Sequence, residues 1–263
     1  MEQYRFLMIG AHPDDIELCS GGLALKLRKK GHSVMFLSMT DGSAGHQHME
    51  RSALAARRKK ECEAVARLFD VAYHIMPFAD AELEPTLEAR KALMRVIRSY
   101  APHVIFTHRT VDYHPDHRAC GQLVMDCSYL VNVPLFCPDA PCPPHTPVIF
   151  SLRDDFTRPL PFQPDLVVPI DDVLEKKIDG ALCHVSQFYE WLPHVERWPE
   201  IANASTFEEK TILLRSYLKE HFFNEASLYP ELMPEGTHYA EVFEWNEYGG
   251  ALTDELRRAM TEP

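Results

Sequence analysis

Short apolar runs recur along this chain and alternate with longer stretches of helical periodicity. The apolar runs predict strands at Phe6–Ile9, Val34–Met39, Tyr73–Met76, Val104–Thr107, Val148–Ser151 and Leu166–Ile170. The periodic stretches predict helices at Gly21–Lys30, Arg51–Phe69, Leu87–Tyr100, His117–Val131, Asp171–Trp191, Phe207–Ala226 and Leu252–Met260. Strands that alternate with helices are typical of a parallel sheet covered by helices. The pattern therefore predicts an α/β fold with a Rossmann-like, mostly parallel sheet flanked by helices.

A proline-rich stretch interrupts the second half of the chain. Six prolines fall between positions 134 and 147. Proline fits neither a helix interior nor a central strand, so we expect an ordered, extended loop that forms a wall or lid of a pocket, or simply covers the protein. With 263 residues and no Gly/Ser linker, residues 1–263 are long enough for one domain, with a core at about 4–245 and a short C-terminal tail.

Two His/Asp clusters follow two of the predicted strands. His12-Pro13-Asp14-Asp15 comes after the run at 6–9, and His114-Pro115-Asp116-His117 comes after the run at 104–107. Ligands of open α/β sheets bind beyond the carboxyl ends of the strands, where both clusters fall. Capping and helix initiation explain Asp and Pro at such junctions, but they do not explain His in both. We therefore expect the clusters to form one metal site.

The residue types suit a catalytic zinc ion. Such zinc commonly has three protein ligands and a water molecule in the fourth position. His12 and Asp15 are three residues apart, which places both on one face of a helical turn, and His117 could supply the third ligand. The same donor set also accepts iron, cobalt or nickel, so the residues leave the metal open.

The remaining members of the clusters suit hydrolysis. Asp14 could act as a general base towards water, and His114 could stabilise an oxyanion and protonate a leaving group. Asp116 could hydrogen-bond one nitrogen of His114 and fix its tautomer.

These motifs resemble those of the PIG-L/LmbE family of zinc-dependent N-deacetylases, which act on N-acetylglucosamine conjugates and related amides. The matching segments are 11–15, 40–45 and 112–118, with weaker matches at 184–187 and 239–243, so the resemblance spans roughly positions 4 to 245. One departure is Ile16, where the commonest form of the family motif has Glu. The resemblance implies an LmbE-like fold.

The resemblance also implies roles for individual residues. It implies that His12, Asp15 and His117 bind zinc, that Asp14 is the general base, and that His114 stabilises the tetrahedral intermediate. These roles agree with those argued from the residues alone.

Further positions are suggested by the resemblance only. Arg58 and Asp80 look like the family's contacts to sugar hydroxyls, although Arg58 could equally be a solvated helix charge and Asp80 an ordinary loop carboxylate. The context of His184 suggests that it lies near the site. Relatives often assemble into trimers or hexamers, so a homo-oligomer is an open expectation.

The sequence therefore predicts a zinc-dependent amidohydrolase that removes an acetyl group from an N-acetylated sugar conjugate or a similar small amide. Zinc would polarise water and the amide carbonyl, and Asp14 would take the proton of the water. Alternatives are a metal-dependent hydrolase of another bond and a non-catalytic sugar- or metal-binding protein. A dinucleotide-binding oxidoreductase ranks last, because no Gly-x-Gly-x-x-Gly follows the first strand.

Charge and composition bear on the expected partners and location of the protein. The formal net charge of −12 disfavours a nucleic-acid partner. No segment approaches the ~18 apolar residues that a membrane span requires. Seven scattered cysteines and the lack of an apolar signal segment favour the reducing cytoplasm.

Overall fold

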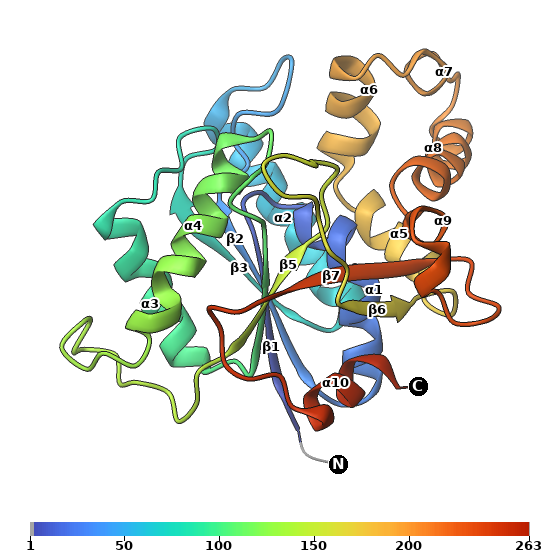
Figure 1. Cartoon of the computed structure of the whole chain (residues 1–263). Coiled ribbons are helices and arrows are strands. Elements are labelled where there is room, and N and C mark those ends of the chain that lie inside the picture. The colour runs from blue at the N-terminus through green and yellow to red at the C-terminus, as the bar shows by residue number, and fades with distance from the viewer. Residues whose placement is uncertain (1–2, 263) are drawn as a thin grey trace.

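A seven-stranded sheet forms the centre of the protein, which is described here over residues 3–262 of a computed structural model (Figure 1). The strand order is β3-β2-β1-β4-β5-β7-β6. The first five of these pair in parallel, and β7 runs antiparallel to both neighbours. The predicted α/β fold with a mostly parallel sheet is confirmed. The strands are β1 (Arg5–Gly10), β2 (Ser33–Thr40), β3 (Ala72–Phe78), β4 (Val104–Thr107), β5 (Val148–Leu152), β6 (Leu166–Pro169) and β7 (Ala240–Asn246).

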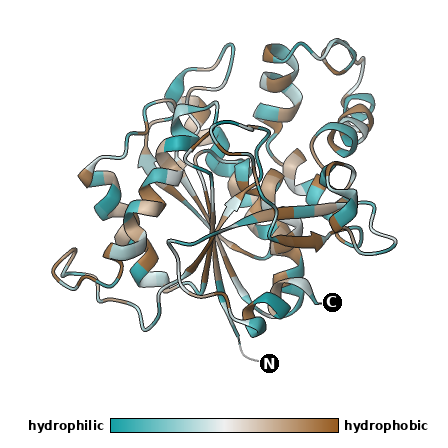
Figure 2. Ribbon diagram, viewed as in Figure 1, coloured by the Kyte–Doolittle hydropathy of each residue, from teal (hydrophilic) through white to brown (hydrophobic). Residues whose placement is uncertain are grey.

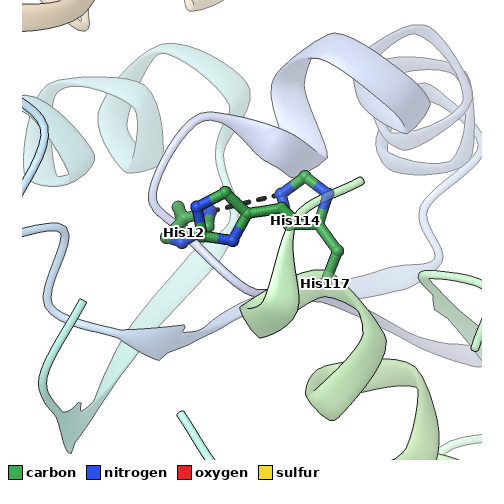
Figure 3. Close-up of side chains that lie close together, drawn as sticks. All are labelled: His12, His114 and His117. Carbon is green, nitrogen blue, oxygen red and sulfur yellow. Dashed lines mark hydrogen bonds between the residues drawn. The ribbon is translucent and has the colours of Figure 1, made fainter. Parts of the chain in front are cut away.

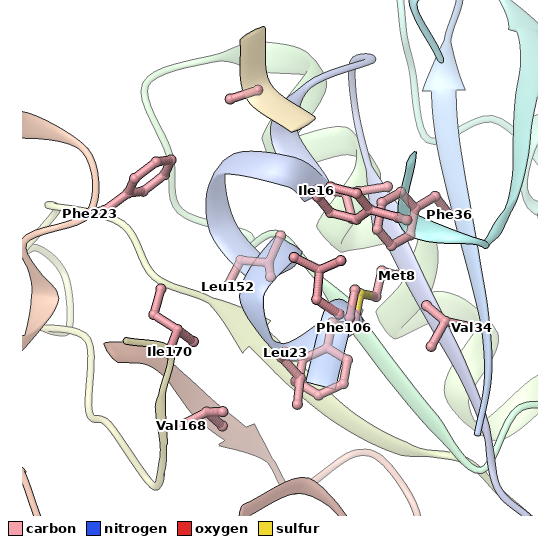
Figure 4. Packing of buried hydrophobic residues seen from close by; sticks show 14 of the residues in the cluster. Met8, Ile16, Leu23, Val34, Phe36, Phe106, Leu152, Val168, Ile170 and Phe223 are labelled. Atoms are coloured by element: carbon pink, nitrogen blue, oxygen red, sulfur yellow. The ribbon is translucent and has the colours of Figure 1, made fainter. Parts of the chain in front are cut away.

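Helices cover both faces of the parallel strands. Side chains of β1 alternate between two buried clusters: Phe6 and Met8 belong to one, and Leu7 and Ile9 to the other. Figure 4 shows part of the first cluster, and Figure 2 shows how apolar residues concentrate on the strands. Burial on both faces explains why these strands are apolar throughout. The first cluster packs under α1 (Asp15–Lys29), α2 (Arg51–Phe69) and α5 (Leu174–Leu182), and the second under α3 (Leu87–Tyr100) and α4 (Pro115–Leu130).

Smaller helices complete the second half of the chain. The predicted helix at 171–191 divides into α5 and a π-helix, and the one at 207–226 divides into α8 and α9. The first helix begins at Asp15 rather than at Gly21. The remaining elements are the π-helix η1 (Ser186–Trp191), α6 (Leu192–Val195), α7 (Pro199–Ala202), α8 (Phe207–His221), α9 (Glu225–Leu228), the 3-10 helix η2 (Pro230–Leu232) and α10 (Asp254–Thr261).

Strand β7 was not predicted from the sequence. Charged residues interrupt its apolar pattern, yet Glu241 is fully buried. Its carboxylate accepts hydrogen bonds of 2.7 Å from the backbone N–H groups of Gly22 and Leu23 and lies 2.7 Å from Lys177 Nζ. A buried Glu with three partners is compatible with a strand interior, which the pattern alone could not indicate.

The proline-rich stretch forms a loop without helix or strand, as expected. It connects the end of α4 to the start of β5, so it lies at the amino edge of the sheet. Both His/Asp clusters lie at the opposite edge, and the idea that this loop is a lid over the site is wrong. The loop is held by the buried guanidinium of Arg98, which donates hydrogen bonds to the carbonyl oxygens of Leu130, Val131, Val133, Phe136, Cys137 and Ala140.

Candidate metal centre

Two neighbouring strands bring the His/Asp clusters together. His12 and Asp15 lie in the turn from β1 into α1, and His114 and His117 lie at the start of α4, beyond the end of β4. Because β1 and β4 pair in parallel, their carboxyl ends meet at the same edge. Figure 3 shows the rings of His12, His114 and His117 grouped together, and the His12 and His114 ring centroids are 4.5 Å apart.

Polar atoms of three side chains form a compact triangle at this point. His12 Nδ1 lies 3.3 Å from His117 Nε2 and 3.6 Å from Asp15 Oδ2. His117 Nε2 lies 3.4 Å from Asp15 Oδ1. Zinc binds nitrogen at about 2.0–2.1 Å, so two ligands of a tetrahedral site lie about 3.4 Å apart. The spacing of the three side chains therefore fits a tetrahedral ion with one position left for another ligand.

Carboxylates orient both imidazole rings of the triangle. His12 Nε2 lies 3.2 Å from Asp116 Oδ2 and 3.3 Å from Asp80 Oδ1. His117 Nδ1 lies 3.1 Å from Asp112 Oδ1. Histidines that bind metals usually donate their other N–H to such a group, which fixes the tautomer. The arrangement leaves His12 Nδ1 and His117 Nε2 as the atoms that face the centre of the triangle.

The Asp116 carboxylate contacts His12, and not His114 as expected. It also accepts hydrogen bonds from the backbone N–H groups of Ala81, at 2.7 Å, and Leu83, at 3.2 Å. The backbone N–H of Asp116, rather than its carboxylate, bonds to His114 Nδ1. Asp116 therefore orients His12, and the carboxylate beside His117, Asp112, was missed although it lies in the matching motif.

Asp14 has an unusual backbone conformation beside the triangle, with φ at 105°. Its side chain makes no capping hydrogen bond to α1, so helix initiation does not explain it. Arg58 Nη2 lies 2.9 Å from Asp14 Oδ2. Burial raises the pKa of Asp14, although the positive charge of Arg58 opposes this. A buried carboxylate with a raised pKa suits a general base, whose pKa should lie near the working pH.

His114 is the N-cap residue of α4. Its Nδ1 accepts the backbone N–H of Asp116 at 3.2 Å, so the neutral ring carries its proton on Nε2. Burial and the neighbouring His12 and His117 lower the pKa of His114. His114 is therefore suited to donate a hydrogen bond from Nε2 as a neutral ring.

His108 is a buried member of the cluster that sequence reasoning missed. Its Nε2 lies 3.0 Å from Asp15 Oδ2, and its ring stacks on His117 with centroids 4.1 Å apart. The only signal was its place directly after β4. Burial would raise the pKa of Asp15, but His117 and His108 hold it well below its usual range. Besides the triangle of His12, Asp15 and His117, residues 3–262 contain three overlapping triplets whose ligand atoms also lie close enough for one ion: His12/His114/His117, Asp15/His108/His117 and His12/Asp80/Asp116.

Arg58 and Asp80 both border the cluster. Arg58 is buried against Asp14, which excludes a solvated helix charge. Gly42 packs against the Arg58 side chain, and a Cβ at this position would lie 2.7 Å from Arg58 Cδ. Its φ of 65° also favours glycine. Asp80 Oδ2 accepts the backbone N–H of Ala44 at 2.9 Å. Burial would raise the pKa of Asp80, but the hydrogen bond with His12 lowers it to about 2.

His184 lies behind the cluster. Its ring is fully buried, and its Nε2 lies 2.9 Å from Glu17 Oε1. Glu17 belongs to α1, two residues after Asp15, so His184 is joined to the helix that carries part of the cluster. The expectation that His184 lies near the site stays a prediction about function.

Comparison with known proteins places this α/β protein with its His/Asp cluster in a family. The model of the GlcNAc-PI de-N-acetylase family, PIG-L, matches residues 7–128, which include both clusters. The diacetylchitobiose deacetylase of Thermococcus kodakarensis is 33% identical over 205 residues, which cover 73% of this chain and 74% of the relative. The chain belongs to the PIG-L/LmbE family of deacetylases.

Solved structures share the fold. The N,N'-diacetylchitobiose deacetylase of Pyrococcus horikoshii, in complex with its inhibitor MPG, aligns with a TM-score of 0.73 and 26% identity over 94% of this chain and 85% of that one. The 4-carboxy-2-hydroxymuconate hydratase of Pseudomonas putida aligns with a TM-score of 0.72 and 15% identity over 96% of this chain and 99% of that one. Because a hydratase has the same fold, the reaction must be argued from the site.

Proposed function

We propose that this protein is a zinc-dependent hydrolase that removes the acetyl group from an N-acetylated sugar or a similar small amide. The observation that carries the proposal is the triangle of His12, Asp15 and His117, with a buried carboxylate, Asp14, and a neutral imidazole donor, His114, beside it. A site that only binds metal needs neither of the last two groups.

His12 Nδ1, His117 Nε2 and the Asp15 carboxylate would hold the ion. When bound, zinc lowers the pKa of a water ligand to about 7 and polarises a carbonyl oxygen. The other residues orient these ligands: Asp116 and Asp80 act on His12, and Asp112 acts on His117.

The chain's own residues then move the protons. Asp14 takes a proton from the water that attacks the amide carbonyl carbon. His114 donates the hydrogen bond of its Nε2–H to the oxygen of the tetrahedral intermediate. The C–N bond breaks as Asp14 passes the proton it took from the water to the amine nitrogen, because the neutral His114 ring has no second proton to give. The products are acetate and a primary amine. Arg58 holds the carboxylate of Asp14 in place through their hydrogen bond.

Substrate contact by Arg58 and Asp80 stays a prediction. Arg58 pairs with Asp14, and Asp80 contacts His12 and the backbone N–H of Ala44. These contacts favour a role in positioning the residues of the cluster ahead of a role in contacting the sugar. No helix formed by residues 3–262 is long and apolar enough to cross a bilayer. All seven cysteines are free thiols, which supports the proposal of a reducing compartment such as the cytoplasm.

The names of the relatives supply the first substrates to test. The purified protein, loaded with zinc, is incubated with N-acetylglucosamine and with N,N'-diacetylchitobiose, and acetate and free amine are measured together. The proposal predicts equal amounts of both. Release of phosphate from a phosphomonoester, with no acetate from either sugar, would instead support a hydrolase of another bond. Binding of sugar without turnover would support the non-catalytic alternative.

A further inference from the structure

Two aromatic side chains lie exposed at the edge of the His/Asp cluster. Tyr113 directly precedes His114 and is 70% exposed, and Phe156, in the segment after β5, is 36% exposed. Their rings stack at a centroid distance of 6.2 Å and an angle of 29°. The Tyr113 ring also lies 5.7 Å from the His114 ring and 5.5 Å from the His117 ring. An apolar surface therefore begins directly beside the cluster.

The position of Phe156 is fixed by polar contacts with Arg109 and Asp154, whose side chains are largely shielded from solvent. Arg109 Nη1 donates to Asp154 at 3.0 Å and to the Phe156 carbonyl oxygen at 3.3 Å, and Arg109 Nη2 donates to the Leu160 carbonyl oxygen at 2.8 Å. The backbone N–H of Phe156 donates to Asp154 at 2.9 Å. Arg109 also pairs with Glu244 of β7 at 3.1 Å. The segment is thus tied to the sheet, and the exposed rings are held in place.

We propose that Tyr113 and Phe156 form a platform for the pyranose ring of the substrate, an inference that rests on the proposed function. In the β-anomer of N-acetylglucosamine all ring substituents are equatorial, so both faces of the ring expose axial C–H groups, and such a face packs well on an aromatic ring. The acetamido group is attached directly to that ring. A substrate whose carbonyl lies at the His/Asp cluster must therefore place its ring within a few ångströms, where Tyr113 lies.

Contiguous exposed aromatic surface beside a site is typical of ligand-binding surfaces. The platform would contact the sugar ring of the substrate and not its acetyl group, so it would give selectivity for the amine part of the amide. Substrates in which a ring carries the acetamido group should therefore be preferred over amides of flexible amines.

The experiment compares two amides, N-acetylglucosamine and the ring-less N-acetylethanolamine, with the zinc-loaded full chain. The measured quantity is the ratio of kcat/KM for the sugar to kcat/KM for the ring-less amide. We expect Tyr113→Ala to lower this ratio about tenfold, through a higher KM for the sugar, and Phe156→Ala to lower it less. Tyr113→Phe keeps the aromatic face and should restore the wild-type ratio. The matched control is Tyr129→Ala, because Tyr129 is 80% exposed in the last turn of α4, away from the cluster.

An unchanged ratio in Tyr113→Ala would overturn the platform. An equal fall in both substrates would do so too, since it would place the effect in the His/Asp cluster itself. If the wild type released acetate from neither amide, the proposed function would fail, and binding of N-acetylglucosamine is then followed by saturation-transfer NMR. Binding that disappears in Tyr113→Ala supports the platform, and absence of binding to the wild type, or binding that persists in Tyr113→Ala, contradicts it.

Discussion

Asp14 has the backbone conformation that non-glycine residues rarely adopt, with φ at 105°. Such strain costs roughly 1–3 kcal/mol and persists where surrounding contacts hold it, often at functional sites. Here the contacts are Arg58 and the tight turn from β1 into α1. In this conformation the carboxylate makes no capping hydrogen bond to α1 and pairs with Arg58 instead, which leaves it available for the proposed role of general base.

Asp14→Asn removes the base and keeps the size of the side chain, and Asn tolerates a positive φ. We expect kcat for deacetylation to fall by about 10²–10⁴-fold, the usual contribution of general base catalysis. Zinc content, measured by elemental analysis, should stay at the wild-type value because Asp14 is not a proposed ligand. A variant with more than a tenth of wild-type activity would show that Asp14 is not the base.

Asp112→Ala tests the orientation of a proposed ligand. His117 Nδ1 would lose its carboxylate partner at 3.1 Å. Loss of such a partner typically lowers metal affinity 10–100-fold, and we expect this range in a competition titration with a zinc chelator. Asp155→Ala is the control, since Asp155 is an exposed aspartate outside the cluster. Equal zinc affinity in the two variants would remove Asp112 from the site.

The sequence indicated which residues gather in the His/Asp cluster, but not which of them contact one another. His and Asp after two strand ends indicated a metal site, because few structural roles explain both. The partner of Asp116 could not be predicted, because the backbone N–H groups of Ala81 and Leu83 come from a loop far away in sequence. His108 was missed because a single His after a strand has no distinguishing pattern.

The π-helix η1 shows why one predicted helix divides into two. Glu61 of α2 accepts hydrogen bonds from Ser186 N at 2.8 Å and from Ser186 Oγ at 2.7 Å. Four residues on, Glu190 lies 2.9 Å from His46 Nε2 and pairs with Arg57. These tertiary contacts tie η1 to α2 and to the loop after β2. Hydrophobic periodicity reports only local spacing along the chain, so it predicted one regular helix at 171–191.

Arg98→Met tests how α3 holds the proline-rich loop. The change leaves buried carbonyl oxygens of the loop without donors, and each such group costs about 1–3 kcal/mol. We expect the free energy of unfolding to fall by roughly 3 kcal/mol or more, measured by urea denaturation. Arg95→Met, on the same helix, removes exposed contacts with Asp139 and with the Lys91 carbonyl oxygen and should lower the free energy of unfolding far less. Equal stability of the two variants would contradict this role of Arg98.

At the scale of the whole molecule, a second group of charged side chains is buried outside the cluster, on α5, α9 and β7. Lys177 and Glu241 are fully buried, and Lys177 Nζ lies 4.0 Å from the centroid of the Phe223 ring. Glu225 is buried near them. Burial raises the pKa of Glu225 to about 7, although the positive charge of Lys177 opposes this.

Glu225→Gln should therefore change how stability depends on pH. The folded pKa of this acid lies above its unfolded value of about 4.3, so the unfolded state releases the proton first and the folded state loses stability as pH rises from about 4 to 7. Below that window the carboxyl is neutral in both states. At pH 8 we expect the variant to be more stable than the wild type by on the order of 3 kcal/mol, and at pH 4 to be nearly equal, measured by urea denaturation. A difference that stays constant between pH 4 and 8 would contradict the raised pKa.

The sequence predicted the parallel strands of the sheet, but it did not predict the antiparallel strand β7. Local apolar runs and intervening helices suffice to predict the strands β1 to β6. The strand β7 follows its neighbour β6 after a long helical segment and then inserts between β5 and β6. That pairing depends on long-range contacts, including Glu241 with Gly22, which no local pattern contains.

The most direct test of the account is a zinc titration of activity. The protein is stripped of metal with a chelator, zinc is added stepwise, and acetate released from N-acetylglucosamine is measured at each step, with His117→Ala in parallel. We predict that activity rises to a plateau at about one zinc per chain and that the variant shows little activity at the same zinc concentrations. Full activity of the stripped protein, or no acetate at any zinc concentration, would contradict a deacetylase built on His12, Asp15 and His117.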